Sequence, residues 1–155
     1  MIIDDTLEFA DAVSVAGSAG TALIGDVVDL TVARDMGNGQ PIYLVLTCDT
    51  SIITGGAAGT IKFQLVSDAS ASIATDGSAT VHLDTGTYVT DGDDANELDA
   101  GATIAVVALP LNGSNAYERY LGILATIGTT TVTAGAINAF LTIDPAGWKA
   151  YPNAI

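Results

Sequence analysis

The stretch TIKFQLVS at residues 60–67 decides the fold class, because its side chains alternate in polarity. Successive side chains of an extended strand point to opposite faces, so one face carries Ile61, Phe63 and Leu65. The other face carries Lys62, Gln64 and Val66. The stretch therefore predicts a β-strand with one face in a hydrophobic core and the other in water.

Residues 41–48 (PIYLVLTC) alternate in the same way, with Ile42, Leu44, Leu46 and Cys48 on one face. The opposite face carries Tyr43, Val45 and Thr47 and is nearly as apolar. A strand with two apolar faces is typical of the middle of a sandwich. In that position Cys48 is expected to be an inert core residue.

Further strands are expected on either side of these two, at residues 23–33, 80–83, 103–109, 117–127 and 130–144. The last is long enough to be split near Ala134 and Gly135. Glycine-containing turns punctuate the chain at 37–39, 55–56, 76–77, 91–92, 112–113 and 128. The pattern predicts one all-β domain over residues 1–155, built as an antiparallel β-sandwich, a jelly roll or a barrel.

Both ends of the chain are expected to be extended arms. Residues 4–16 have mixed periodicity, which favours an extended N-terminal arm over a helix. The C-terminal tail, residues 145–155, contains Trp148 and Tyr151 and is apolar for a free end. Such a tail packs on its own sheet or, less often, on a neighbouring subunit.

The charge balance argues against several classes of partner. Eighteen acidic residues against four basic ones give a formal net charge of −14. Nucleic acid and anionic membrane surfaces both require clustered cations, so neither is expected as a partner. No apolar run is long enough to predict a membrane span. The start, MIIDD, lacks the basic and apolar regions of a signal peptide, so we expect a protein made and kept in a cytoplasm.

One set of residues could be read as a catalytic triad. His82 is the only histidine, and Ser78 and Asp84 are near it in the sequence. Triads are defined by geometry in space, so this proximity carries little information. We expect instead a strand histidine that is hydrogen-bonded on a sheet surface, in a protein that is not an enzyme and needs no cofactor.

The run DGDDANE at residues 91–97 is the one candidate for a cation site. Its oxygen-bearing side chains could hold calcium, and its weak candidate ligands are Asp91, Asp93, Asp94 and Glu97. The spacing does not fit an EF-hand, because Ala95 and Ala102 stand where ligands are required. A solvated acidic loop is the simpler interpretation.

Several short stretches run in order along the whole chain. They are LEF (7–9), VDL (28–30), ARDMGNGQPIYL (33–44), FQL (63–65), LPL (109–111), ERYL (118–121), AFLTIDP (139–145) and WKAYPNA (148–154). Together they resemble the phage capsid cement family typified by a Bordetella phage head protein. The loops around residues 75–102 are longer and more acidic than is usual in that family.

The resemblance implies a jelly-roll β-sandwich that decorates the outer capsid surface of a virion. Such a protein binds the major capsid protein at subunit junctions, associates with itself as a homodimer or homotrimer, and stabilises the mature head. A related alternative is another phage structural module, such as a head fibre or a host-adhesion β-sandwich.

Four matched residues are candidates for a capsid interface or a self-interface. Arg34 and Arg119 are flanked by Asp35 and Glu118, so each either closes a turn with an internal ion pair or contacts capsid acids. Trp148 and Tyr151 are either packed aromatics or anchors at a subunit junction, because Trp, Tyr and Arg dominate interface energetics.

Overall fold

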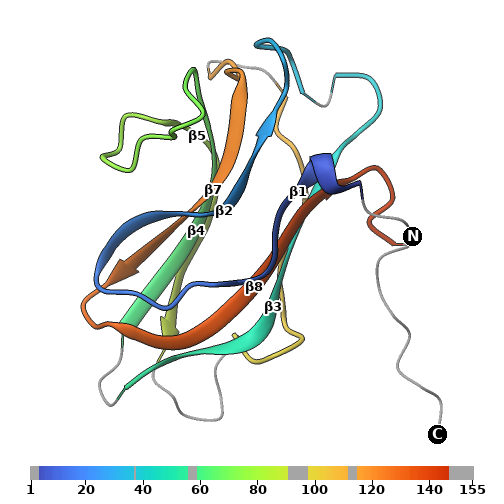
Figure 1. Cartoon of the computed structure of the whole chain (residues 1–155). Coiled ribbons are helices and arrows are strands. Elements are labelled where there is room, and N and C mark those ends of the chain that lie inside the picture. The colour runs from blue at the N-terminus through green and yellow to red at the C-terminus, as the bar shows by residue number, and fades with distance from the viewer. Residues whose placement is uncertain (1–3, 37, 56–58, 91–97, 112–114, 147–155) are drawn as a thin grey trace, which may run out of the picture.

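The computed structural model describes residues 4–36, 38–55, 59–90, 98–111 and 115–146. Within these residues a short 3-10 turn, η1 (Asp5–Leu7), precedes eight strands (Figure 1). They are β1 (Glu8–Ser14), β2 (Gly20–Asp29), β3 (Tyr43–Thr54), β4 (Gly59–Asp68), β5 (Thr80–Thr90), β6 (Thr103–Ala108), β7 (Tyr120–Gly128) and β8 (Val132–Thr142). The predicted all-β class is confirmed.

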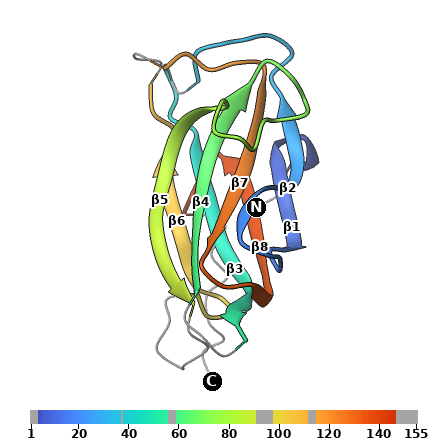
Figure 2. The ribbon, with the colours of Figure 1, turned by 90° about the vertical axis from the view of Figure 1, so that its left-hand side faces the viewer.

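The strands form two four-stranded antiparallel sheets that pack face to face (Figure 2). One sheet has the order β1-β8-β3-β6 and the other β2-β7-β4-β5. Apart from β4 and β5, which are neighbours in one sheet, successive strands fall in different sheets, and this order is that of a jelly roll. The structure is therefore a β-sandwich with jelly-roll connections.

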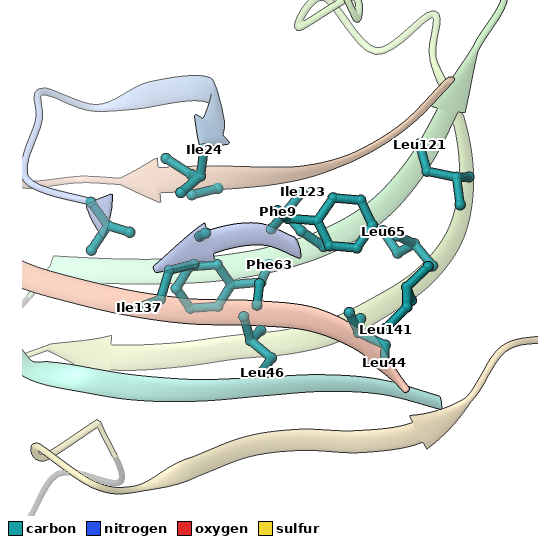
Figure 3. Close-up of a cluster of buried hydrophobic side chains, with 14 of the residues drawn as sticks. Phe9, Ile24, Leu44, Leu46, Phe63, Leu65, Leu121, Ile123, Ile137 and Leu141 are labelled. Atoms are coloured by element: carbon teal, nitrogen blue, oxygen red, sulfur yellow. The ribbon is translucent and has the colours of Figure 1, made fainter. Parts of the chain in front are cut away.

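The core lies between the sheets and is filled by aliphatic and phenylalanine side chains from both (Figure 3). Ile61, Phe63 and Leu65 of β4 are at most 1% exposed, so the predicted inner face of residues 60–67 is confirmed. Strand β3 lies between β8 and β6, as its two apolar faces predicted. Even Val45, on its outer face, is fully buried.

The outer face of β4 departs from the prediction at one residue. Val66 was expected in water, but it is fully buried beside Leu124. Residues 69–79 fold back over the sheet and cover both with Ile73 and Ala79. A side chain at position 122 would collide with Ile73, so Gly122 makes room for this loop.

The N-terminal arm was predicted wrongly for most of its length. Residues 8–14 are the edge strand β1, which pairs with β8 from Glu8↔Phe140 to Ser14↔Ala136. Two register irregularities and a positive φ of 49° at Ala12 disturb the strand, and this removes the alternation that would have identified it.

Three other strand boundaries differ from the expectations. Strand β8 runs unbroken to Thr142 in place of splitting near Gly135, and β5 continues to Thr90, well beyond the predicted residues 80–83. Strand β2 ends at Asp29, short of the predicted residue 33. The predicted C-terminal arm falls largely on residues 147–155, which lie outside the described residues.

The two long edges of the sandwich differ. At one, which we call the tight edge, β1 and β2 lie side by side (Figure 2). Gly25 of β2 has a φ of 66°, and a Cβ there would overlap the carbonyl oxygen of Phe9. At the other, the open edge, β5 and β6 are joined in the described structure by a long hydrogen bond of 3.4 Å from the Tyr88 hydroxyl to the Ile104 carbonyl.

Candidate functional site

One end of the sandwich brings together both of the predicted arginines. There β2 ends, β3 and β7 begin, and β8 ends, because Asp29 pairs with Tyr120 and Tyr43 pairs with Thr142. We call this end the loop pole; it comprises η1 and residues 4–7, 29–36, 38–42, 109–111, 115–120 and 142–146 (Figure 1).

A cavity of about 450 Å³ opens at the loop pole between η1 and the β2–β3 connection. Its apolar wall includes Val28, Leu30 and Met36, all of which are buried. Its polar rim includes Thr31, Arg34 and Asn38, which are exposed. An apolar wall with a polar rim can take an apolar side chain of a partner and bind the polar groups around it.

Arg119 is held in a fixed position at this pole. Its Nε and Nη2 atoms donate to the two carboxylate oxygens of Asp29 at 2.8 and 2.7 Å, and its guanidinium lies 4.8 Å from the centre of the Tyr120 ring. These hydrogen bonds lower the pKa of Asp29 to about 2 and raise the pKa of Arg119. A bidentate pair of this kind fixes the plane of the guanidinium.

The ion pair considered for Arg119 was with its neighbour Glu118, and this partner was wrong. Glu118 accepts a hydrogen bond from the Thr80 hydroxyl at 2.9 Å, and the ion pair of Arg119 is made with Asp29, ninety positions earlier in the chain. An internal ion pair was one of the two predicted roles, so this role is realised at Arg119 with a distant carboxylate.

Asp29 and Thr31 connect the two arginines, and the sequence analysis missed both. Asp29 also accepts from the Thr31 backbone N–H at 2.7 Å, and the Thr31 hydroxyl accepts from Arg34 Nη2 at 3.0 Å. Thr31 has a φ of 68°, a conformation stabilised by this local hydrogen bond. The sequence signal for this link was an aspartate that stands two residues before a threonine at the end of a strand.

Arg34 is exposed on the β2–β3 connection, on the rim of the cavity. The other two interface candidates, Trp148 and Tyr151, lie outside the described residues. The structure therefore places two of the four predicted residues together and describes neither of the others.

The weak cation candidates Asp91, Asp93, Asp94 and Glu97 also lie outside the described residues. In the part of the chain that the structure describes, no group of three His, Cys, Asp or Glu side chains is close enough to hold a metal ion.

The structure does not assemble the Ser78–His82–Asp84 set. His82 Nε2 lies 2.8 Å from the Ser67 hydroxyl, and its ring stacks on Tyr117 at a centroid distance of 3.8 Å. Asp84 bonds instead to Lys62 and Gln64, at 3.2 and 2.8 Å. Burial lowers the pKa of His82, although Glu118 opposes this shift.

Ser67 is fully buried and accepts a further hydrogen bond from the Glu118 backbone N–H. A hydroxyl in that position cannot reach a substrate. His82 is therefore a hydrogen-bonded strand histidine, as predicted, which joins β4, β5 and the start of β7.

Cys48 is a buried free thiol, as predicted. Its Sγ–H lies 2.9 Å from the Leu98 carbonyl, and desolvation raises its pKa to about 11. A thiol with such a pKa is protonated at neutral pH and unreactive.

A family model described as Bbp16 matches residues 9–141, which include all strands from β2 to β7 and most of β1 and β8. The family name suggests a Bordetella phage protein. No curated protein matches the chain. Among the described residues there is no helix with the length and apolar character of a membrane span.

Proposed function

The chain belongs to the Bbp16 family, and on that premise we propose that it is a capsid cement protein of a tailed phage. The proposed partner is the major capsid protein, bound on the outer surface of the shell at subunit junctions. The consequence of binding is a mature head that resists the internal pressure of its DNA. The observation that carries the proposal is the family match over residues 9–141.

The loop pole supports the proposal as a binding surface. Val32, Leu111 and Ile143 belong to this pole and are 57%, 66% and 61% exposed. Several large aliphatic side chains exposed at one end of a domain are typical of protein interaction surfaces. Arg34 is the proposed polar contact, because Arg119 is already paired with Asp29.

The proposed mechanism requires no bond to be made or broken, and we propose a non-enzymatic role without a cofactor. Each copy contributes a modest interface, and many copies on one shell add their contributions. The net charge of −14 disfavours binding to the packaged DNA. It also limits indiscriminate association before a shell is available.

A heat challenge of purified heads tests the stabilising role. Heads carrying the protein are compared with bare heads, and DNA release is followed as the temperature rises. We expect decorated heads to release DNA at a higher temperature. Equal release temperatures would refute a cement role.

Co-sedimentation with expanded heads tests the loop pole. We expect Arg34→Ala to weaken binding about tenfold or more, as loss of an interface arginine commonly does. Lys62→Ala is the matched control, because it removes an equal charge from β4, where Lys62 pairs with Asp84 at 3.2 Å. Equal weakening by both variants would show that only the overall charge matters.

The same assay separates the alternatives. Trp148→Ala and Tyr151→Ala test the two remaining candidates, with reduced head binding as the expected result. A head-fibre or host-adhesion module would bind cells or glycans in place of expanded heads. His82→Ala should leave head binding intact, whereas loss of a measurable turnover in that variant would indicate an enzyme.

A further inference from the structure

We propose that Asn38 and Gly39 form a site of spontaneous modification, at which Asn38 loses ammonia and becomes a carboxylate on the rim of the loop-pole cavity. The reaction is a property of the folded chain itself. Its consequence for head binding rests on the proposed function, because Asn38 and Arg34 line the same cavity.

The chemical step needs only water as a co-reactant. The backbone nitrogen of Gly39 attacks Cγ of Asn38, and the new C–N bond closes a five-membered succinimide ring. The Cγ–Nδ2 bond breaks, and the proton from the Gly39 N–H leaves with the amide nitrogen as ammonia. Water then opens the ring. Attack at Cγ gives aspartate in an ordinary backbone, and attack at the backbone carbonyl carbon gives isoaspartate, in which the chain continues through the side chain.

The first argument is the residue that supplies the attacking nitrogen. A side chain on that residue hinders ring closure, and Gly39 has none. A Cβ built on Gly39 would meet no atom within 4 Å, so the space beside its backbone is open. Its φ of 106° lies where glycine moves freely, which allows the nitrogen to turn toward the Asn38 side chain.

The second argument is the position of the pair in the fold. Asn38, Gly39 and the two residues that follow them are all exposed. They lie in the connection between β2 and β3, before β3 begins at Tyr43, so no strand ladder fixes their peptide groups (Figure 1). Water therefore reaches the amide, and the ring can close without opening a sheet.

The third argument compares Asn38 with the other two asparagines among the described residues. Asn138 lies within β8, and its Oδ1 accepts a hydrogen bond from the Ala12 backbone N–H at 2.6 Å. Asn115 Nδ2 donates to the Val81 carbonyl at 3.4 Å. Both are followed by an alanine, whose methyl group hinders ring closure. In the described part of the chain, Asn38 therefore has the most favourable surroundings for this reaction.

The new carboxylate changes the charge of the cavity rim. Arg34 is the proposed polar contact with the capsid, and it lies on this rim. An aspartate at position 38 adds a negative charge there and can pair with the guanidinium in competition with a partner. We therefore expect the modified protein to bind heads less tightly, so that unbound protein loses affinity as it ages.

Ageing of the purified full chain in water enriched in the heavy isotope of oxygen tests the site. Ring opening during ageing adds a labelled oxygen, whereas later digestion in ordinary water adds none. Trypsin cuts after Arg34 and Lys62, and the resulting peptide 35–62 contains Asn38 as its only asparagine. We expect this peptide to gain the label, and to gain it faster at alkaline pH, because the Gly39 nitrogen must lose its proton.

Two controls belong to the same digest. The tryptic peptide 120–149 contains Asn138 and should stay unlabelled. Asn38→Gln should remove the label from peptide 35–62, because a glutamine closes the larger ring slowly, and Gln40 precedes a proline that has no N–H.

Three outcomes would overturn the proposal. One is a peptide 35–62 that stays unlabelled in the folded chain, and labelling only in urea would then show that the fold protects Asn38. The second is equal labelling of peptides 35–62 and 120–149. The third is a label in peptide 35–62 that persists in Asn38→Gln.

Co-sedimentation with expanded heads tests the consequence for binding. Fresh and aged samples of the wild type and of Asn38→Gln are compared. We expect ageing to weaken binding of the wild type severalfold and to leave the variant at its own starting value. No loss in the wild type, or an equal loss in both chains, would overturn the consequence for binding. If none of the samples bound heads, the proposed function would fail, and the labelling result would still decide the modification site.

Discussion

The tight edge and the open edge of the sandwich use different means to close the same gap between two sheets. At the tight edge two backbones meet, and this requires a glycine at position 25 and a bulged β2. At the open edge a tyrosine hydroxyl spans the gap, and exposed valines remain on β6. The difference teaches that one edge is specified by close contact between two backbones, whereas the other is bridged by a side-chain hydrogen bond.

The largest expected loss of folding stability comes from a substitution at the tight edge. Phe9 is fully buried at the centre of the core, so Phe9→Ala should reduce the free energy of unfolding by about 3–5 kcal/mol. Val107→Ala on the open edge removes a side chain that is 37% exposed and should cost less than about 1 kcal/mol. Urea denaturation of both variants measures the difference. Equal losses would show that the two edges contribute equally to stability.

Two glycines with positive φ sharpen the comparison. Gly25→Ala adds both backbone strain and a collision with the Phe9 carbonyl, so we expect a loss of about 2–4 kcal/mol. Gly86→Ala on β5 has a similar φ, 78°, but no atom within 4 Å of the added Cβ. It should lose only about 1–2 kcal/mol from strain alone. Similar losses in the two variants would mean that β1 and β2 are not in close contact.

A smaller loss of folding stability is expected when the pH is lowered, because His82 of β5 then takes up a proton. The pKa of His82 lies below its ordinary value in the folded chain, so the unfolded chain takes up a proton first as the pH falls. The stabilising contribution of neutral His82 is therefore complete above about pH 6.5 and is lost as the pH falls through the folded pKa.

The measurement is the Tm of the wild type and of His82→Gln between pH 7.5 and pH 5. The wild type should lose more stability over this interval, since the variant has no imidazole to protonate. Carboxylates such as Glu8, whose pKa is raised, titrate in both proteins and cancel in the difference. Parallel curves would contradict the lowering of the His82 pKa by burial in the folded chain.

The smallest expected loss of folding stability follows from removing the hydrogen bond that spans the open edge. Tyr88→Phe removes a hydroxyl that donates across a long 3.4 Å distance, so the loss should be at most about 0.5 kcal/mol. Urea denaturation checks it. A loss above about 1.5 kcal/mol would show that the open edge is held as firmly as the tight one.

The features that the sequence revealed are those with a regular local period. Residues 60–67 and 41–48 alternate because each strand has fixed neighbours over its whole length, and burial follows that alternation. Strand β1 was missed because its two irregularities interrupt the period. Val66 was misplaced because the loop that covers it makes a long-range contact that its own strand does not encode.

The candidate site was predictable only in part for the same reason. Arg34 and Arg119 could be selected as rare cations in an acidic chain. Their link through Asp29 and Thr31 depends on the pairing of β2 with β7, which brings Asp29 opposite Tyr120. Sequence neighbours therefore indicated the wrong carboxylate for Arg119.

The pairing of β1 with β8 has a practical consequence for attaching cargo. Because Glu8 lies opposite Phe140, the described chain begins at Asp4 and leaves at residue 146 on the same side of the molecule, within the loop pole. Fluorescent proteins or affinity tags joined at Asp4 or at residue 146 would start from the surface proposed to face the shell. Strand β3 ends at Thr54 and β4 begins at Gly59 at the opposite end of the sandwich, so a position between these two residues is the better insertion point for a peptide meant to be displayed on decorated particles.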